Sequence, residues 1–210
     1  MHELHYGQTL ADNWKKVLLF GLAAAVVAVG LSLFFPLRYS STIRLLIIQK
    51  QLSQADPYTA MKASERIADN LGQIVYTTSF YDKVMAAKFN IDPSVFSADD
   101  IKRRRFWSEM IDTAVIRNSG MLQVTIYHKD PLQAEQVARA IAFVMTTEGK
   151  EYVGGGDLSV KMVDQPLRSR WPVKPNLPAN AFMGLVLGLL VGSGYVLNTA
   201  RRHGLFTMSE

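Results

Sequence analysis

The sequence predicts an α+β domain, with a small mixed sheet and packed helices, held outside the cytoplasm between two transmembrane helices. Long apolar stretches without charge lie near the two ends of the 210-residue chain. Between them, strand-like and helix-like patterns alternate over a length that suits one ordinary domain. Apolar residues make up 49% of the chain and charged residues 20%, a composition typical of neither a disordered nor a fibrous protein.

The first apolar stretch runs without a charged residue from Val17 to Leu37. A helix rises about 1.5 Å per residue, so roughly 20 residues cross a hydrocarbon core about 30 Å thick. The alternative is a cleaved signal peptide, but the stretch exceeds the usual apolar length of about 7–15 residues, and no polar cleavage region follows Phe35. We therefore expect a short N-terminal segment over 1–16 and a transmembrane helix over 17–37.

The second apolar stretch covers residues 179–198 and predicts another transmembrane helix, followed by a tail over 199–210. Its alternative is a buried core helix. Gly184, Gly188 and Gly192 recur every four residues and share one helix face, where the missing side chains let another helix approach closely. Glycine is also simply common in membrane helices. The sequence leaves open whether the packing partner is the first span or another subunit.

Basic residues beside the two stretches bear on their orientation. Two pairs, Lys15–Lys16 and Arg201–Arg202, lie on the side of the chain ends, whereas other basic residues flank the segment between the spans. The positive-inside rule gives short ends more weight than long translocated loops. We therefore expect both termini in the cytoplasm and the domain outside it.

The domain between the spans, residues 38–165, begins with a strand over Ser40–Gln49, which is rich in β-branched and aliphatic residues. Helical periodicity and helix-start residues then predict three helices and a loop. They are, in order, a helix from Pro57, a helix capped by Ser79 that runs through Phe89, a loop over Asn90–Ser97, and a helix over Ala98–Ile111.

A β-hairpin is the clearest local signal in the chain. Two strand-like segments, Thr113–Arg117 and Met121–Tyr127, flank the turn residues Asn118, Ser119 and Gly120. A last strand is expected over Leu158–Val163. The first and last strands each lead directly into a span, and we therefore expect them to pair with each other.

A helix is expected between the hairpin and the last strand. Asp130 suits its N-cap, Pro131 its first position, and Gln133 completes a capping-box pattern. The glycines at 154–156 are expected to end it. Its apolar stripe consists of Ala134, Val137, Ala138, Ile141, Val144 and Met145.

Four prolines precede the second span, in a segment over 166–178. They are separated by multiples of three residues, and a polyproline II helix has three residues per turn. All four would then line one edge of a stiff juxtamembrane strut. The alternative is an ordinary proline-rich linker. The four are Pro166, Pro172, Pro175 and Pro178.

The chain carries no recognisable catalytic, cofactor-binding or metal-binding motif, so we expect a protein that is not an enzyme. Cysteine is absent, which excludes disulfides and thiolate chemistry. No phosphate-binding loop and no nucleophile motif occurs. The Asp99–Asp100 pair is better interpreted as helix-start charges than as paired catalytic carboxylates.

The charge pattern contains one dense basic run, formed by Lys102, Arg103, Arg104 and Arg105. Such a run is usually a solvated face. The functional alternative is contact with an anionic glycan or with lipid headgroups. Elsewhere between the spans basic and acidic residues nearly balance, so the net charge of +5 gives no reason to expect a nucleic-acid partner.

Four stretches of the chain match the pattern of a known family: Tyr39–Ile48, Ser79–Asp92, Leu122–Val144 and the proline-rich approach to the second span. With the layout of spans and domain, they resemble the polysaccharide co-polymerases, the Wzz-type chain-length determinants of bacterial surface polysaccharide assembly. The stretch Leu122–Val144 is the most specific, because a strand that ends in an acidic-proline pair and continues into an alanine-rich helix is a family feature.

The resemblance implies a two-pass protein of the bacterial cytoplasmic (inner) membrane, with both termini in the cytoplasm and no catalytic residues or cofactor. It implies homo-oligomeric rings that act with a membrane polysaccharide polymerase to regulate the chain length or the export of a capsule, exopolysaccharide or O-antigen type polymer.

The chain departs from the long members of the family, which insert an extended helical arm where only Tyr152–Asp157 stand here. It resembles the short form that works beside a cytoplasmic tyrosine autokinase. An alternative function is therefore activation of such a kinase, with Arg201, Arg202 and Phe206 as the docking segment, or Phe206 inserted at the membrane surface. A more distant alternative is a two-span sensor or adaptor with an extracytoplasmic ligand.

Overall fold

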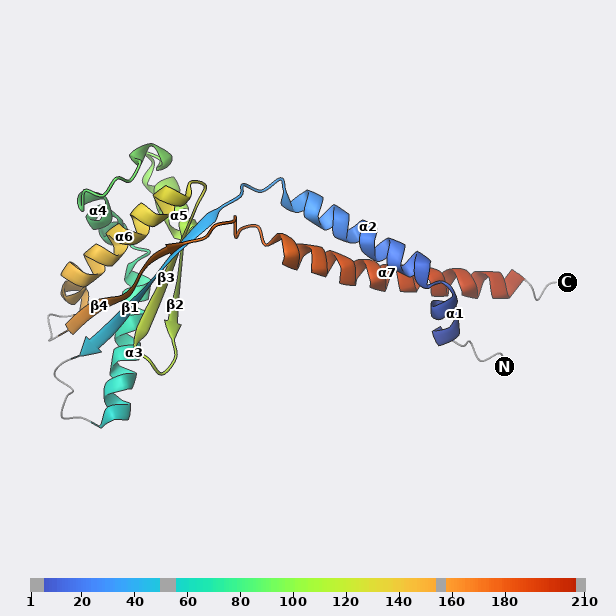
Figure 1. Ribbon diagram of the computed structural model, residues 1–210, viewed down its shortest axis with the longest axis horizontal. Coiled ribbons are helices and arrows are strands. Elements are labelled where there is room, and N and C mark those ends of the chain that lie inside the picture. Colours follow the sequence, from blue (N-terminus) through green and yellow to red (C-terminus); the bar gives the residue numbers. More distant parts are fainter. Residues whose placement is uncertain (1–5, 50–55, 154–157, 207–210) are drawn as a thin grey trace. The chain divides into compact units, whose positions relative to one another are not determined.

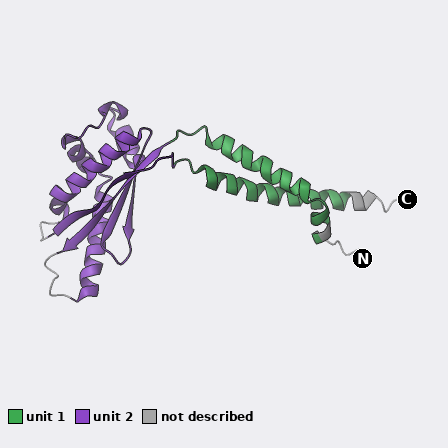
Figure 2. Ribbon diagram, in the orientation of Figure 1, with its two compact units in different colours: residues 1–37, 174–210 green, residues 38–173 purple. Residues whose placement is uncertain are grey.

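The computed structural model describes residues 6–49, 56–153 and 158–206, and the chain divides into two compact units (Figure 2). One unit comprises residues 1–37 together with 174–210, and the other comprises residues 38–173. Within the described residues the fold is mixed α+β, with a four-stranded antiparallel sheet and seven α-helices (Figure 1). The helical unit is thus assembled from the two ends of the chain.

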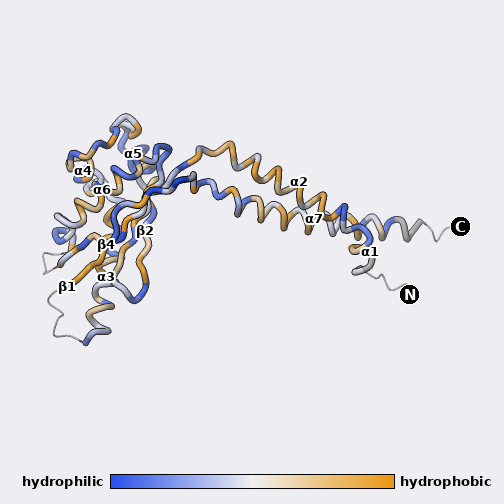
Figure 3. The backbone as a smooth tube through the Cα atoms, viewed as in Figure 1, coloured by the Kyte–Doolittle hydropathy of each residue, from blue (hydrophilic) through white to orange (hydrophobic). Residues whose placement is uncertain are grey.

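The helical unit contains α1 (Tyr6–Asp12), α2 (Trp14–Ser32) and α7 (Leu177–Phe206). Two stretches, Trp14–Ser32 and Leu177–Arg202, are long and apolar enough to cross a membrane. Figure 3 shows the apolar residues that run along both helices. The structure thus contains two helices that meet the length and polarity requirements of the predicted spans.

The ends of these helices differ from the prediction, and proline explains both differences. We expected the first span to reach Leu37, but α2 ends at Ser32. Pro36 lacks the N–H that would bond to the carbonyl of Ser32 in a continuing helix, and it disfavours the helical conformation in Phe35. In contrast, α7 begins earlier than the predicted residue 179. Pro178 lies in its first turn, where an N–H group would have no helical partner.

The sheet has the strand order β2-β3-β1-β4, and every neighbouring pair is antiparallel. The prediction of a mixed sheet was therefore wrong, because no pair of neighbouring strands runs in the same direction. The first and last strands pair with each other, as expected. The strands are β1 (Tyr39–Gln49), β2 (Ile111–Ile116), β3 (Met121–His128) and β4 (Leu158–Arg168).

One face of the sheet is buried and the other is open. On β1, Ile43, Leu45 and Ile47 are buried, whereas the alternating Arg44 is exposed. Two helices, α3 (Pro57–Ile74) and α6 (Pro131–Glu148), pack against the sheet, and the predicted apolar stripe of α6 is buried throughout. Alternation along the strands and helical periodicity therefore place the core between these helices and one sheet face.

Side-chain caps start the helices of this unit, and one cap differs from the prediction. The Thr77 hydroxyl, not that of Ser79, caps α4 (Thr78–Ala86) by accepting a hydrogen bond from the N–H of Phe80 at 3.3 Å. The helix was expected to reach Phe89. It ends earlier, because Lys88 has a φ of 58° and lies in the left-handed region.

The start of α6 is also only partly as predicted. Asp130 is the N-cap and accepts from the N–H of Leu132 at 2.8 Å. The capping box does not form, because the Gln133 amide binds a distant loop. Its Oε1 accepts from the N–H of Asp92 (3.0 Å) and its Nε2 donates to the carbonyl of Asn90 (3.2 Å). The side chain expected to complete a cap instead ties α6 to the loop after α4.

The C-terminal end of α6 was expected at the glycines 154–156, which lie outside the described residues. The helix ends at Glu148, and a 3-10 segment, η3 (Gly149–Val153), follows it. A second 3-10 segment, η2 (Pro93–Val95), lies within the predicted loop. The last strand extends beyond the predicted Val163 to Arg168.

The hairpin turn needs glycine at its last position. Asn118 and Gly120 have φ angles of 57° and 60°, in the left-handed region. A Cβ atom on Gly120 would also lie 3.2 Å from the carbonyl oxygen of Ile47 and 3.0 Å from the Cβ of Ser64. The turn contains the three predicted residues and also Arg117, because Ile116 pairs with Met121. Close approach by β1 and α3 adds a second requirement for glycine.

Trp107, on α5 (Asp100–Met110), anchors the helices above the sheet. Its indole Nε1 donates to the carbonyl oxygen of Val75 at 2.7 Å, and only 1% of the residue is exposed. The ring meets Tyr81 edge to face with centroids 5.1 Å apart. Trp107 therefore links α5 to α4 and to the end of α3 through one buried hydrogen bond and an aromatic contact.

Replacing Trp107 with phenylalanine should lower the free energy of unfolding of the domain by about 1–3 kcal/mol, because the buried carbonyl of Val75 loses its donor. Urea unfolding of the full chain in detergent micelles, followed by circular dichroism, measures the change. Trp171, which is 79% exposed, provides the matched control: Trp171→Phe should change stability by less than about 0.5 kcal/mol. Equal effects of the two substitutions would contradict this role.

Candidate functional site

The glycine face of α7 packs directly against α2. A Cβ atom on Gly184 would lie 2.7 Å from the Cβ of Ala28, and one on Gly188 would lie 2.5 Å from the carbonyl oxygen of Phe20. One on Gly192 would lie 2.8 Å from the Cβ of Phe20. These separations leave no room for a side chain. In the structure, the three glycines predicted to pack lie against the first apolar helix.

Two further contacts join the helix pair outside the glycine face. The Asn180 Nδ2 donates to the hydroxyl of Ser32 at 2.7 Å, and that hydroxyl donates to the carbonyl of Ala28 at 2.8 Å. At the other end, the rings of Phe20 and Tyr195 lie with centroids 5.3 Å apart. A polar link, three glycines and an aromatic contact therefore follow one another along the interface.

The four prolines do not form the predicted continuous strut. Pro166 lies within strand β4, and Pro178 lies in the first turn of α7. The start of the 166–178 segment therefore belongs to the sheet, and its end belongs to α7. Between them, the backbone bends at residues 170 and 171, and Pro172 and Pro175 lie in irregular structure. A polyproline II helix over the whole segment is excluded.

The basic run lies in the first two turns of α5, and its members differ in their contacts. The Arg103 guanidinium pairs with Asp100 at 2.7 Å and lies over the Tyr81 ring, 5.4 Å from its centroid. Arg105 pairs with Glu109 at 3.0 Å. Lys102 and Arg104 are exposed and form no ion pair with a described residue. Two of the four charges are therefore locally compensated.

The acidic pair beside this run starts α5, as predicted. The carboxylate of Asp99 accepts hydrogen bonds from the N–H groups of Ile101 (2.8 Å) and Lys102 (3.2 Å), and Asp100 pairs with Arg103. Among the described residues, no cluster of three or more His, Cys, Asp or Glu side chains has the geometry to hold a metal ion.

The predicted docking segment continues the helix that contains the second apolar stretch. Arg201 and Arg202 are exposed on α7, which runs to Phe206. The side chain of Phe206 and the residues from 207 onward lie outside the described part of the chain. The assignment of this segment to kinase docking stays a prediction.

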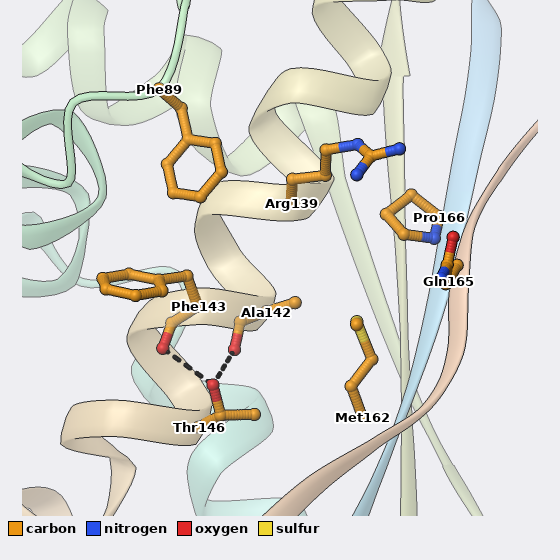
Figure 4. Close-up of a pocket in the computed structure, with 8 residues that line it drawn as sticks. All are labelled: Phe89, Arg139, Ala142, Phe143, Thr146, Met162, Gln165 and Pro166. Carbon is orange, nitrogen blue, oxygen red and sulfur yellow. Dashed lines mark hydrogen bonds between the residues drawn. The ribbon is translucent and has the colours of Figure 1, made fainter.

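A pocket that the sequence did not reveal lies between α6 and the edge strand β4 (Figure 4). Its volume is about 280 Å³. Phe89 and Phe143 lie on one side, with ring centroids 5.8 Å apart, and Met162 lies on the β4 side. The remaining lining residues are Arg139, Ala142, Thr146, Gln165 and Pro166. The pocket therefore combines an aromatic wall with two planar polar side chains.

The charge beside the pocket is positive in sum. Arg139 donates through Nε (3.1 Å) and Nη2 (2.7 Å) to one carboxylate oxygen of Glu135, and Arg168 approaches the other oxygen at 3.7 Å. One carboxylate thus faces two guanidinium groups. The Nη1 of Arg139 takes no part in that ion pair, and the Gln165 side chain forms no hydrogen bond with a described residue. Both groups are available to a ligand.

A second ionic cluster holds the far end of α6. The Lys83 ammonium on α4 contacts Glu148 at 2.5 Å and Glu151 at 2.7 Å. Hydrogen bonds to these two carboxylates raise the pKa of Lys83, and the Lys83 hydrogen bond lowers the pKa of Glu151. The lowered pKa stabilises the fold at neutral pH, and this contribution is lost as the pH falls through the folded-state pKa of Glu151. The cluster therefore has a structural explanation.

Compared with known proteins, the chain matches no family model and no curated protein sequence.

Substituting Gly188 with alanine should separate α2 from α7, because the added methyl group would meet the backbone of Phe20 and Gly21. The chain contains no cysteine, so a Ser32→Cys/Asn180→Cys pair reports helix proximity by oxidative cross-linking without background. Gly188→Ala in that background should lower the cross-linking rate several-fold. Gly194→Ala is the matched control, since nothing lies within 4 Å of its added Cβ. Equal rates in both variants would contradict the packing role.

Proposed function

We propose that the protein is a non-enzymatic membrane co-polymerase that regulates the chain length or export of a bacterial surface polysaccharide. The observation that carries the proposal is the chain layout. An α+β domain begins and ends with two paired strands, and each of these strands leads towards one of two apolar helices that pack together. This layout fits the resemblance to Wzz-type proteins carried by Tyr39–Ile48 and Leu122–Val144.

In this proposal the helices α2 and α7 span the cytoplasmic membrane, both termini lie in the cytoplasm, and the domain lies outside. Copies of the chain assemble into a homo-oligomer that acts beside a membrane polymerase. The protein performs no bond chemistry itself. Its effect comes from holding the polymer or the polymerase.

The pocket between α6 and β4 is the candidate contact for the polymer. The apolar rings of Phe89 and Phe143 can pack against the C–H face of a sugar ring. The planar groups of Arg139 and Gln165 offer several donors and one acceptor for its hydroxyls. Because two arginines face the one carboxylate of Glu135, the site favours an acidic sugar over a neutral one.

Deleting the gene in its host should change the amount or the length distribution of surface polysaccharide, because the proposed regulator would be missing. Gel electrophoresis of the extracted polymer measures both properties. Expression of the wild-type chain from a plasmid should restore them. An unchanged amount and length distribution of the polymer in the deletion strain would refute the proposed function.

Phe143→Ala should alter the polymer length distribution while leaving the protein folded, since Phe143 is 46% exposed and contributes to the pocket wall. The complemented deletion strain and the same gel provide the measurement, with protein levels checked by immunoblotting. Tyr58→Ala, at a 63% exposed aromatic residue on α3, is the matched control and should behave as wild type. If Phe143→Ala also behaved as wild type, the pocket would have no role in length control.

A further inference from the structure

A second pocket lies within the helical unit, where the start of α2 meets the last turns of α7. Its volume is about 320 Å³. The residues Asn13 and Lys16 line it from the start of α2, and Tyr195, Val196, Thr199 and Ala200 line it from α7. The pocket is thus built from the two ends of the chain.

The groups that face this pocket include donors suited to an anion. Lys16 is exposed and forms no ion pair with any residue that the structure describes. The Nδ2 of Asn13 uses one hydrogen in a bond to the carbonyl of Thr9 at 3.1 Å, which leaves its second hydrogen for another acceptor. The Thr199 hydroxyl donates to the carbonyl of Tyr195 at 2.9 Å and retains only acceptor capacity. Lys16 is therefore the principal cation of the pocket.

The surrounding charge is also positive. Neither α2 nor α7 contains an Asp or Glu residue. Lys15, Lys16, Arg201 and Arg202 gather at this end of the two helices, and Asp12 is the one carboxylate among residues 12–16 and 195–202. A pocket with this charge excess favours an anionic occupant.

The pocket lies at the depth where phospholipid headgroups are found, if the two helices cross a bilayer. It sits at the ends of the stretches Trp14–Ser32 and Leu177–Arg202. Trp14 and Tyr195 are 56% and 55% exposed there, as aromatic residues at a membrane–water interface are. One side of the pocket is therefore apolar, and the other side reaches charged and polar groups.

A track for an acyl chain continues from the pocket along α7. Leu187 and Val191 precede Tyr195 and Thr199 at intervals of four residues, so all four share one helix face. Leu187 is 57% exposed and Val191 is 63% exposed. An amphiphile whose headgroup occupies the pocket could place its tail on this apolar surface, whereas an inorganic anion has no apolar group to contact it.

We propose that this pocket binds the headgroup of an anionic phospholipid, with the phosphate held by Lys16 and Asn13 and an acyl chain laid along Leu187 and Val191. Basic pockets between transmembrane helices are suited to such headgroups. The bound lipid would fill the gap between the helix ends and join α2 to α7 where the glycine face stops. The inference requires the helix pair to lie in a membrane but does not depend on a role in polysaccharide assembly.

The test uses the full chain, purified in detergent and mixed with equimolar phosphatidylglycerol and phosphatidylcholine of the same acyl composition. Native mass spectrometry counts the lipids that each protein retains. The wild type should retain phosphatidylglycerol several-fold better than phosphatidylcholine. Lys16→Gln should lose most of this preference, whereas Lys15→Gln should keep it. Lys15 is the matched control because it carries the same charge next in sequence and lies by the Trp14 ring, outside the pocket lining.

A second variant tests the cavity without changing charge. Ala200→Leu should fill the pocket and reduce phosphatidylglycerol retention several-fold. Oxidative cross-linking of the Ser32→Cys/Asn180→Cys pair in the same variant should confirm that the helix pair is intact. The proposal is overturned by equal losses for Lys15→Gln and Lys16→Gln, by equal retention of the two lipids, or by unchanged retention in Ala200→Leu. Displacement of the lipid by millimolar inorganic phosphate would also overturn it in favour of a free-phosphate site.

Discussion

The antiparallel pairing of β1 with β4 is the constraint on which the rest of the fold depends. The two strands are the first and last of the domain, and their register continues past the sheet in single hydrogen bonds. The N–H of Ser169 donates to the carbonyl of Ser40 at 2.8 Å, and the N–H of Val173 donates to that of Arg38 at 2.8 Å. The two chain segments that lead to the apolar helices therefore leave the domain side by side.

Most elements of the domain follow from local signals, and the differences arise where distant residues compete. The β2–β3 hairpin and the cap at Asp130 depend on neighbours in sequence, and both were predicted. At the cap, the N–H of Asp130 already donates to Nδ1 of His128 at 3.0 Å. The loop at Asn90 and Asp92 instead offers the Gln133 amide a donor and an acceptor at once. The antiparallel pairing of β1 with β3 likewise joins residues distant in sequence, and no local signal predicted it.

The proline segment shows the same competition between local and distant partners. A spacing of three residues favours polyproline II in isolation, and this conformation makes no internal hydrogen bonds. Strand β1 provides pairing partners for Arg168 and Leu167, and the sheet therefore captures the start of the segment, Pro166 included. Proline is tolerated there because β4 is an edge strand, where a missing N–H removes no ladder bond within the sheet. The register of the β1–β4 pair shifts between Thr42 and Leu45 of β1, where β4 has more residues than β1. These irregularities accommodate the extra residues of β4.

The two pockets show how much of each candidate site can be predicted from the sequence. Phe143 is an apolar residue of α6 that lies outside the buried apolar stripe, and this is the one local feature of the sequence that indicates the domain pocket. The other walls of the pocket come from the loop at Phe89 and from β4. One wall of the pocket in the helical unit could be predicted in part, since Lys16 was recognised as a charge beside the first apolar stretch. The opposite wall could not, because it depends on how α7 packs against α2. That fit rests on three glycines, whose missing side chains let the two helices approach closely. Close approach at Gly184, Gly188 and Gly192 fixes the register, and the Asn180–Ser32 bond fixes it again. A shift of one residue in either direction would bring a leucine, Leu187 or Leu189, into the space at Gly188, which excludes even a methyl group. Both walls of the pocket therefore keep their positions through the same three glycines.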